Sequence, residues 1–178
     1  MGFYISKYNV SYKKYDEYTD LTDQPYIQPT DRTKKWAFWR KPNHPVNLIT
    51  WYQANAYCGW LAKQTGLPYS LPTEAQWEYV ARNNGNENWN FATDDGKQHI
   101  GKNFPSYKMI TSQKYNAGGA LIALPVGSLP CTPQGICGLN GEVNQWVRDW
   151  YSPTYYSKSP VSDPQGPKDG TLKVGRSS

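Results

Sequence analysis

Cysteine and histidine are scarce in this sequence, which has three cysteines and two histidines among 178 residues. A soft metal ion needs thiolates or imidazoles close together, and these five residues show no recognised metal-ligand spacing. No Ser-His-Asp pattern or phosphate-binding glycine loop stands out either. No apolar run approaches transmembrane length, and mean hydropathy is −0.80. We therefore expect no metal centre, no recognisable catalytic set and no transmembrane segment.

Aromatic and turn-forming residues are abundant instead. Eight tryptophans and fifteen tyrosines accompany fifteen glycines and fourteen prolines. This composition is typical of an aromatic core held by many irregular turns, in a loop-rich α+β domain rather than a helical bundle. The length fits one domain with a core of its own.

The net charge of +5 mostly indicates a solvated, lysine-decorated surface. One loop concentrates cations around Trp36, Phe38 and Trp39, with basic residues at 32, 34, 35, 40 and 41. Nucleic-acid binding needs such interleaving of charge and stacking rings, but a loop that packs its tryptophans inward explains the pattern more simply. A protein- or membrane-facing patch is the third interpretation, and we expect no nucleic-acid partner.

Residues 70–82 (SLPTEAQWEYVAR) predict one amphipathic helix. Thr73 can cap it, and Gln76 can reach back to the cap, which makes a capping box. Glu74 places a negative charge in the first turn, where the helix dipole favours it. The remaining pattern is a buried face of Trp77, Val80 and Ala81, with Glu78 and Arg82 paired at i,i+4 on the other side.

Two further helices follow from caps at Ser11 and Thr50. The first is expected to run to about Thr19, and the second to a glycine stop at Gly66. The second helix should bury Trp51, Ala54, Cys58 and Leu61. Strands are predicted for residues 3–10, 121–126 and 172–174, and residues 143–150 are either a strand or an aromatic turn.

Cys131 and Cys137 bracket the tight turn TPQGI. They are either two unpaired thiols or a local disulfide formed in an oxidising compartment. Cys58 lies on the apolar face of its predicted helix and is expected to be a small core residue.

Four stretches together resemble the formylglycine-generating enzyme family, also called sulfatase-modifying factors. They are PVNLITWYQANAYCGWLAKQTG, SLPTEAQWEYVAR, GICGLNGEVNQWVRDWY and YYSKSPVSDPQGPKDGTLKV, and their order and spacing agree with the family from about Tyr4 onward. The resemblance implies an α+β, C-type-lectin-like fold with two or three short helices and small antiparallel sheets. Residues 1–178 would form a single domain of this kind that lacks the family's C-terminal segment.

In catalytic members of the family, two copper-binding cysteines beyond an RGGS motif oxidise a substrate cysteine to formylglycine. The corresponding motif here is Gly175-Arg176-Ser177-Ser178, and neither catalytic cysteine can be assigned to a residue of this chain. We therefore expect no catalytic residue, no cofactor-binding residue and no cofactor.

The family also binds calcium at two places, through main-chain carbonyls and a few carboxylate or amide side chains. At one place the side-chain ligands correspond to Gly138 and Gln145, with Gly141 and Val143 supplying carbonyls. The other begins at Asn103-Phe104 and needs an Asp where residues 118–120 read Gly-Gly-Ala. Because a hard cation prefers charged oxygen ligands, we expect no metal at either place.

The resemblance with lost ligands implies a non-catalytic, protein-binding member of the family. Such members include bacterial regulators and immunity or accessory proteins linked to type VI secretion. Aromatic residues dominate interface hot spots, so Trp36, Trp39, Tyr155 and Tyr156 are the candidate anchors for a protein partner, with core filling as the alternative for each.

Two other functions stay open at this point. One is a formylglycine-generating oxidase whose catalytic segment is missing from this chain, and the other is a lectin-like binder of glycan or an anionic surface through the basic 32–41 loop. The opening Met1-Gly2 looks like a trimmed start, and we expect a periplasmic or secreted protein.

Overall fold

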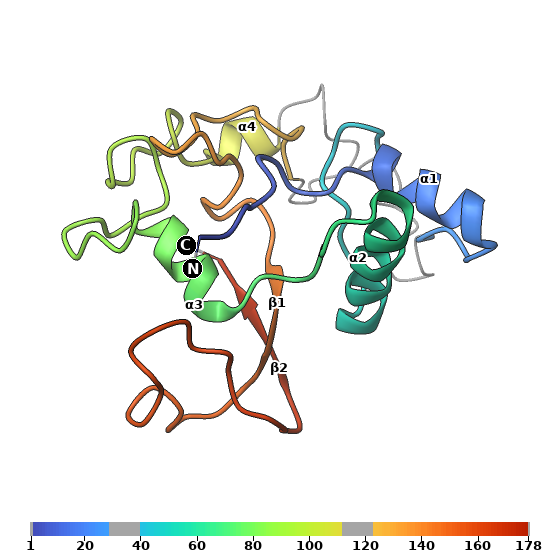
Figure 1. Cartoon of the computed structure of the whole chain (residues 1–178). Coiled ribbons are helices and arrows are strands. Elements are labelled where there is room, and N and C mark those ends of the chain that lie inside the picture. The colour runs from blue at the N-terminus through green and yellow to red at the C-terminus, as the bar shows by residue number, and fades with distance from the viewer. Residues whose placement is uncertain (1, 29–39, 112–122, 178) are drawn as a thin grey trace.

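The computed structural model describes residues 2–28, 40–111 and 123–177. Within them the chain forms four helices and one two-stranded antiparallel sheet, joined by long loops (Figure 1). The elements are α1 (Tyr12–Thr22), α2 (Trp51–Thr65), α3 (Glu74–Ala81), α4 (Tyr107–Thr111), β1 (Gln145–Trp150) and β2 (Lys173–Arg176). This arrangement confirms the predicted α+β class. The five-residue α4 was not predicted.

All three predicted helix starts are confirmed by their caps. Ser11 accepts a hydrogen bond from the Lys14 amide at the start of α1. Reciprocal capping boxes are present at Thr50, before α2, and at Thr73, before α3. Gly66 ends α2 in a left-handed conformation, with φ of 69°, whereas α1 continues three residues beyond the predicted end at Thr19.

The strand predictions are only partly right. β1 and β2 confirm the segments predicted at 143–150 and 172–174 within one to two residues at most ends. The prediction for residues 3–10 is wrong, because this segment lies extended without a partner strand and is held by single hydrogen bonds, such as Cys137 N–H to the Lys7 carbonyl. Residues 123–126 form no strand either, and residues 121 and 122 lie outside the described residues.

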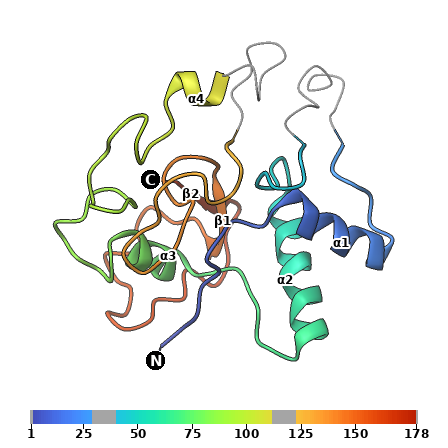
Figure 2. The same ribbon diagram turned by 90° about the horizontal axis from the view of Figure 1, so that it is seen from above.

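The sheet lies between two groups of helices. Helices α1 and α2 lie together on one side of β1 and β2, and α3 lies on the other (Figures 1 and 2). The two strands pair with Gln145 opposite Arg176 and Trp150 opposite Lys173, with an irregular register between them. The loop that connects the strands, residues 151–172, extends away from the rest of the chain (Figure 1).

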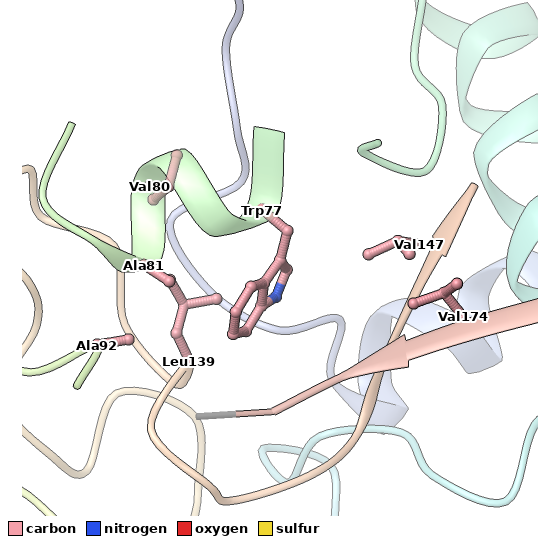
Figure 3. Packing of buried hydrophobic residues seen from close by; sticks show 7 residues of the cluster. All are labelled: Trp77, Val80, Ala81, Ala92, Leu139, Val147 and Val174. Carbon is pink, nitrogen blue, oxygen red and sulfur yellow. The ribbon is translucent and has the colours of Figure 1, made fainter. Parts of the chain in front are cut away.

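The core between α3 and the sheet is organised around one tryptophan. The Trp77 side chain is 2% exposed and extends from α3 toward the segment that carries Leu139 (Figure 3). The same cluster contains Val80, Ala81, Ala92, Leu139, Val147 and Val174. The predicted buried face of α3 is therefore confirmed.

A second, tyrosine-rich core joins α1 to α2. Tyr15 and Tyr57 stack with ring centroids 5.7 Å apart, and Tyr18 meets Tyr57 edge to face. On α2 only Ala54 and Tyr57 are fully buried, while Cys58, Leu61 and other apolar residues are partly buried against the cluster. Of the four residues predicted for this face, Ala54 is buried and Trp51, Cys58 and Leu61 are partly buried. The buried Tyr57 was not predicted.

A lysine connects the two strands to α2. The Lys173 ammonium lies 3.9 Å from the Trp51 ring centroid and 3.7 Å from that of Trp150. It also donates a hydrogen bond of 3.0 Å to the Arg148 carbonyl. Because a cation between two indole faces is attracted by both rings, Lys173 holds β2 against β1 and the first turn of α2.

The cap of α3 gives a first prediction. Replacing Thr73, which is fully buried, by valine keeps its shape but removes the hydroxyl that accepts the Gln76 amide. We expect the free energy of unfolding to fall by about 1–2 kcal/mol, measured by urea denaturation. Thr171→Val, at an exposed loop residue, should change it little, and equal effects of the two substitutions would contradict the assignment.

Candidate binding site around residues 138–146

The segment between the disulfide and β1 is held by side-chain amides. Gln145, the first residue of β1, donates a hydrogen bond of 2.6 Å from Nε2 to the Gly138 carbonyl. Its Oε1 accepts a hydrogen bond of 2.6 Å from the Trp77 indole. Asn9 donates a second hydrogen bond, of 3.0 Å, to the same carbonyl. The four residues therefore connect the N-terminal segment, α3 and β1.

Gly138 is required by this arrangement. Its φ of 83° belongs to the left-handed region that favours glycine. A β-carbon there would lie 2.7 Å from Asn9 Nδ2 and 3.4 Å from Glu142 Oε2. A larger residue would therefore displace the Asn9 amide, and the ends of both side chains lie beside Gly138.

Glu142 is the one carboxylate in this segment, and its environment is unusual. Both carboxylate oxygens are shielded from solvent and have no hydrogen-bond partner among the described residues. Desolvation raises the pKa of Glu142 to about 7. A buried carboxylate without a partner is costly when charged, so this side chain takes up a proton near neutral pH.

A groove opens next to this segment. It has a volume of about 380 Å³ and lies between the N-terminal segment, the loop before α2 and the start of β1. Leu48 at its edge is 60% exposed and has a φ of 57°, which is rare for a branched residue. The groove is lined by uncharged residues only. They are Asn9, Val10, Val46, Asn47, Leu48, Ile49, Ala54, Leu71, Val143, Asn144, Gln145 and Trp146.

The two predicted anchors that the structure describes, Tyr155 and Tyr156, do not line this groove. Trp36 and Trp39 lie outside the described residues. Tyr155 and Tyr156 lie on the 151–172 loop, with ring centroids 5.5 Å apart. The Tyr155 hydroxyl accepts the Gly166 amide, so this ring is used within the loop, whereas Tyr156 is 54% exposed.

Polar contacts join the start of α3 to both strands. Asp149 accepts a hydrogen bond of 2.8 Å from the Glu74 amide, the first N–H of the helix. Burial raises the pKa of Asp149, and the bond from Glu74 opposes this effect. Arg176 pairs with both Glu74 and Glu78. These contacts fix β2 to α3 and leave their charges paired.

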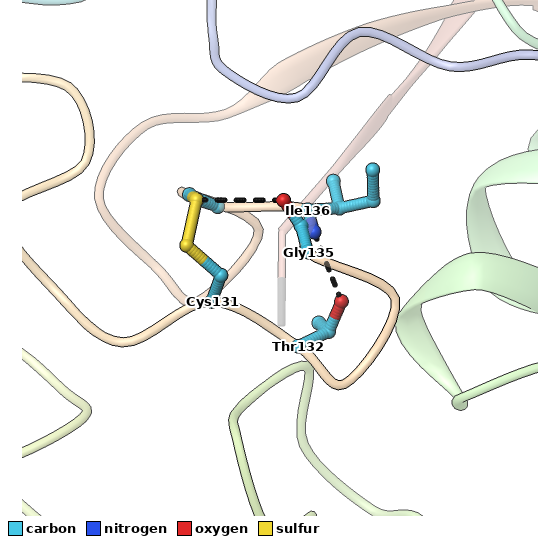
Figure 4. Close-up of a disulfide and its surroundings, with 5 residues drawn as sticks. Cys131, Thr132, Gly135 and Ile136 are labelled. Atoms are coloured by element: carbon cyan, nitrogen blue, oxygen red, sulfur yellow. Dashed lines mark hydrogen bonds between the residues drawn. A yellow bond between two sulfur atoms is a disulfide. The ribbon is translucent and has the colours of Figure 1, made fainter.

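The cysteines are not arranged as metal ligands. Cys131 and Cys137 form a disulfide, which settles the alternatives left open by the sequence (Figure 4). The turn between them is also closed by the Ile136 amide, which donates to the Thr132 hydroxyl. Cys58 is the free cysteine on α2, and burial raises the pKa of its thiol.

The second place where the family resemblance implies calcium, at Asn103, is also held by hydrogen bonds. Asn103 is fully buried, and its Oδ1 accepts a hydrogen bond of 2.7 Å from the His99 amide. Its Nδ2 donates to Asp94 at 2.7 Å and to the Lys97 carbonyl at 3.1 Å. Residues 118–120, which the sequence comparison aligned with the acidic ligand, lie outside the described residues.

Across the described ranges no group of three or more His, Cys, Asp or Glu side chains could hold a metal ion. Among the ligand positions in these ranges, the side chains of Gln145 and Asn103 are taken up by hydrogen bonds. The described helices also include none long and apolar enough to cross a membrane.

Sequence reasoning missed several residues of this site. Asn9 is 129 residues from Gly138, and no local pattern places the two together. The role of Glu142 had one visible signal, a single charged residue within the otherwise uncharged run GLNGEVNQW. The groove is made by loops from three parts of the chain, which no periodic pattern predicts.

Comparison with known proteins places the chain in a family. The profile of the sulfatase-modifying factor enzyme 1-like domain matches residues 1–176. A formylglycine-generating enzyme of Streptomyces coelicolor is 36% identical over 144 residues, which cover 76% of this chain and 42% of that protein. The Mus musculus enzyme of the same name is 31% identical over 153 residues, covering 79% and 39%. The chain thus spans about two-fifths of the length of these relatives.

Two further similarities bear on the use of this fold. The serine/threonine-protein kinase Pkn1 of Chlamydia trachomatis is 33% identical over 135 residues, which cover 75% of this chain but 19% of the kinase. The structure of PvdO from Pseudomonas aeruginosa has a TM-score of 0.68 at 24% identity and covers 97% of this chain and 66% of that chain. The latter similarity supports the fold alone.

Glu142 gives a pH-dependent prediction. Its pKa in the folded state, about 7, lies above the ordinary value of 4.5, so the folded state binds the proton more tightly than the unfolded state. The resulting loss of stability is absent below pH 4.5, grows as pH rises toward 7 and is complete above 7. Glu142→Gln should remove it, so that the variant is more stable than wild type by about 2–3 kcal/mol at pH 8 and similar at pH 4.5.

The measurement is urea denaturation of both proteins at several pH values between 4.5 and 8. Glu87→Gln, at an exposed residue, is the matched control and should follow wild type. A difference between Glu142→Gln and wild type that does not change with pH would show that burial of this carboxylate has been misassigned.

Proposed function

This chain belongs to the sulfatase-modifying factor enzyme 1-like family, and we propose that it uses the family's scaffold to bind another protein without carrying oxidase chemistry in these 178 residues. The observation that carries the proposal is the state of the cysteines. Cys131 and Cys137 are bonded to each other, and burial raises the pKa of Cys58. Copper needs thiolate ligands close together, and a disulfide with one buried thiol does not fit it.

The relatives support a role of the domain beyond oxidation. A segment similar to this chain makes up about a fifth of a protein named as a kinase. The scaffold is therefore found in proteins of different named activities, as expected when function resides in sites rather than in the fold. Binding of a partner requires an exposed surface and not a reactive thiol.

The 151–172 loop supplies such a surface. Tyr151, Tyr156 and Leu172 are each more than half exposed on it, and Val161 is fully exposed. Exposed tyrosines bury large area with few rotatable bonds when a partner covers them. Tyr156 is the anchor that we propose, while Tyr155 supports the loop by accepting the Gly166 amide. Trp36 and Trp39 remain proposed anchors of the same partner.

A second candidate is formylglycine generation itself. It is favoured by the 36% identity to the Streptomyces coelicolor enzyme. In this case thiols from outside these 178 residues would supply the copper ligands, and the present residues would supply the scaffold.

The binding proposal predicts a specific loss on changing Tyr156. Wild-type chain used as bait in a lysate of the source cell should retain a partner, identified by mass spectrometry. The bacterial regulators and type VI secretion proteins implied by the family are the classes to examine. Tyr156→Ser should reduce the retained amount about tenfold or more, because a buried aromatic anchor contributes at least about 2 kcal/mol.

Tyr4→Ser is the matched control, since Tyr4 is fully exposed and far from Tyr156 in the sequence. It should retain the partner as wild type does. Thermal unfolding of both variants separates loss of binding from loss of folding, because the Tyr156 hydroxyl also bonds to Glu74. Equal retention by wild type and Tyr156→Ser would exclude Tyr156 as the anchor.

An oxidation assay separates the two candidates. The 178-residue chain, loaded with copper and supplied with oxygen and a cysteine-containing peptide, should leave the peptide thiol unchanged by mass spectrometry. A formylglycine-generating enzyme serves as positive control. Conversion of the peptide thiol to an aldehyde by this chain would reject the non-catalytic proposal.

A further inference from the structure

Around Gln145, hydrogen bonds hold together a segment that a metal ion holds in the family. The family resemblance implies a calcium ion at this place, with ligands at the positions of Gly138 and Gln145. We propose that in this chain the carboxamide N–H group of Gln145 occupies the position that the cation would take, so that the segment is held together without metal. The inference goes beyond the proposed function, since it concerns how the loop next to the groove is fixed.

The first step is the orientation of the Gln145 carboxamide. The Trp77 indole has one N–H and no acceptor, so it must face the amide oxygen. The donor–acceptor distance is 2.6 Å. Consequently the NH₂ group of Gln145 faces the other way, where it donates to the Gly138 carbonyl at 2.6 Å. The opposite orientation would bring two donors together at Trp77 and two acceptors together at Gly138.

At the two positions where the resemblance places side-chain ligands, the oxygens present are already hydrogen-bonded. The Gly138 carbonyl accepts hydrogen bonds from both Gln145 and Asn9, which uses its two lone pairs. Gln145 Oε1 accepts from Trp77. Calcium takes six to eight oxygen ligands, and the described residues leave it neither of these two. These two positions therefore offer the ion no free oxygen.

The same principle holds at Asn103. A backbone N–H, from His99, faces its Oδ1, and its Nδ2 points toward the Asp94 carboxylate and the Lys97 carbonyl. An amide nitrogen again lies among oxygens, as a cation would. Two unrelated donors thus fix two carboxamides in the same sense.

The third step concerns Glu142, whose oxygens have no partner among the described residues. It lies beside Gly138, as the contact distance of a β-carbon at that glycine demonstrates. A single change, Gln145→Glu, would replace the donating NH₂ group by an oxygen facing the Gly138 carbonyl. The carboxylates at positions 142 and 145 would then lie beside the Gly138 carbonyl, which keeps only the hydrogen bond from Asn9. Two carboxylates and a carbonyl are the ligand chemistry of a hard cation.

The experiment compares wild type with Gln145→Glu by thermal unfolding, in EDTA and in calcium chloride up to 10 mM. We expect the wild-type midpoint to be the same in both. Gln145→Glu should unfold about 5–10 °C lower in EDTA and recover most of this difference with millimolar calcium. Adding Glu142→Gln to Gln145→Glu should shift the required calcium concentration upward about tenfold, because the site loses one charge.

Two outcomes would overturn the proposal. One is a calcium-dependent rise of the wild-type midpoint, and the other is a Gln145→Glu protein as stable as wild type in EDTA. If Gln145→Glu does not fold, the wild-type protein decides. Its Gln145 side-chain NH₂ protons should exchange slowly with solvent in ¹⁵N-resolved NMR spectra and keep their shifts when calcium is added. Fast exchange, or shifts that follow calcium, would reject the inference.

Discussion

The hydrogen bond from the Trp77 indole to Gln145 is the contact on which the rest of this structure depends. Trp77 brings α3 into the core at 2% exposure, and its N–H determines which way the Gln145 carboxamide faces. Truncating a buried tryptophan to alanine costs about 3–5 kcal/mol, before the orientation of the amide is considered. Trp77 therefore lies at the apolar centre of the core between α3 and the sheet, and it also fixes the orientation of the Gln145 side chain next to that core.

In this chain, side chains supply hydrogen bonds to backbone groups that pair between strands in other α+β domains. The described residues contain one sheet, of two short strands, yet buried backbone groups must still find partners. Asn9 donates a hydrogen bond to the Gly138 carbonyl, Asn140 donates to the Asn103 carbonyl, and Lys173 donates to the Arg148 carbonyl. This explains how long irregular loops can be well packed, and why uncharged amides are placed at loop closures.

The sequence predicted what is local and missed what joins distant segments. Caps at Ser11, Thr50 and Thr73 defined three helices, because a capping box lies within four residues. The strand expected at residues 3–10 is absent, since alternation alone cannot supply a neighbour for pairing. The groove and the Asn9–Gly138 contact depend on loops that meet only in the folded chain. The disulfide could be posed as one of two alternatives but not decided.

In this chain the contacts that hold the helices and strands together differ from those that order the segment at residues 138–145. The residues of that segment can therefore change while the fold is kept. Caps, Trp77 and the Lys173 clamp hold the elements, and none of them requires a charged ligand. At position 145 glutamine has the shape of glutamate but carries a donor in place of one oxygen, so the carbonyl that faces it is satisfied from within the chain. The surface loop between β1 and β2 takes no part in these contacts, and it is the surface that we propose for a partner.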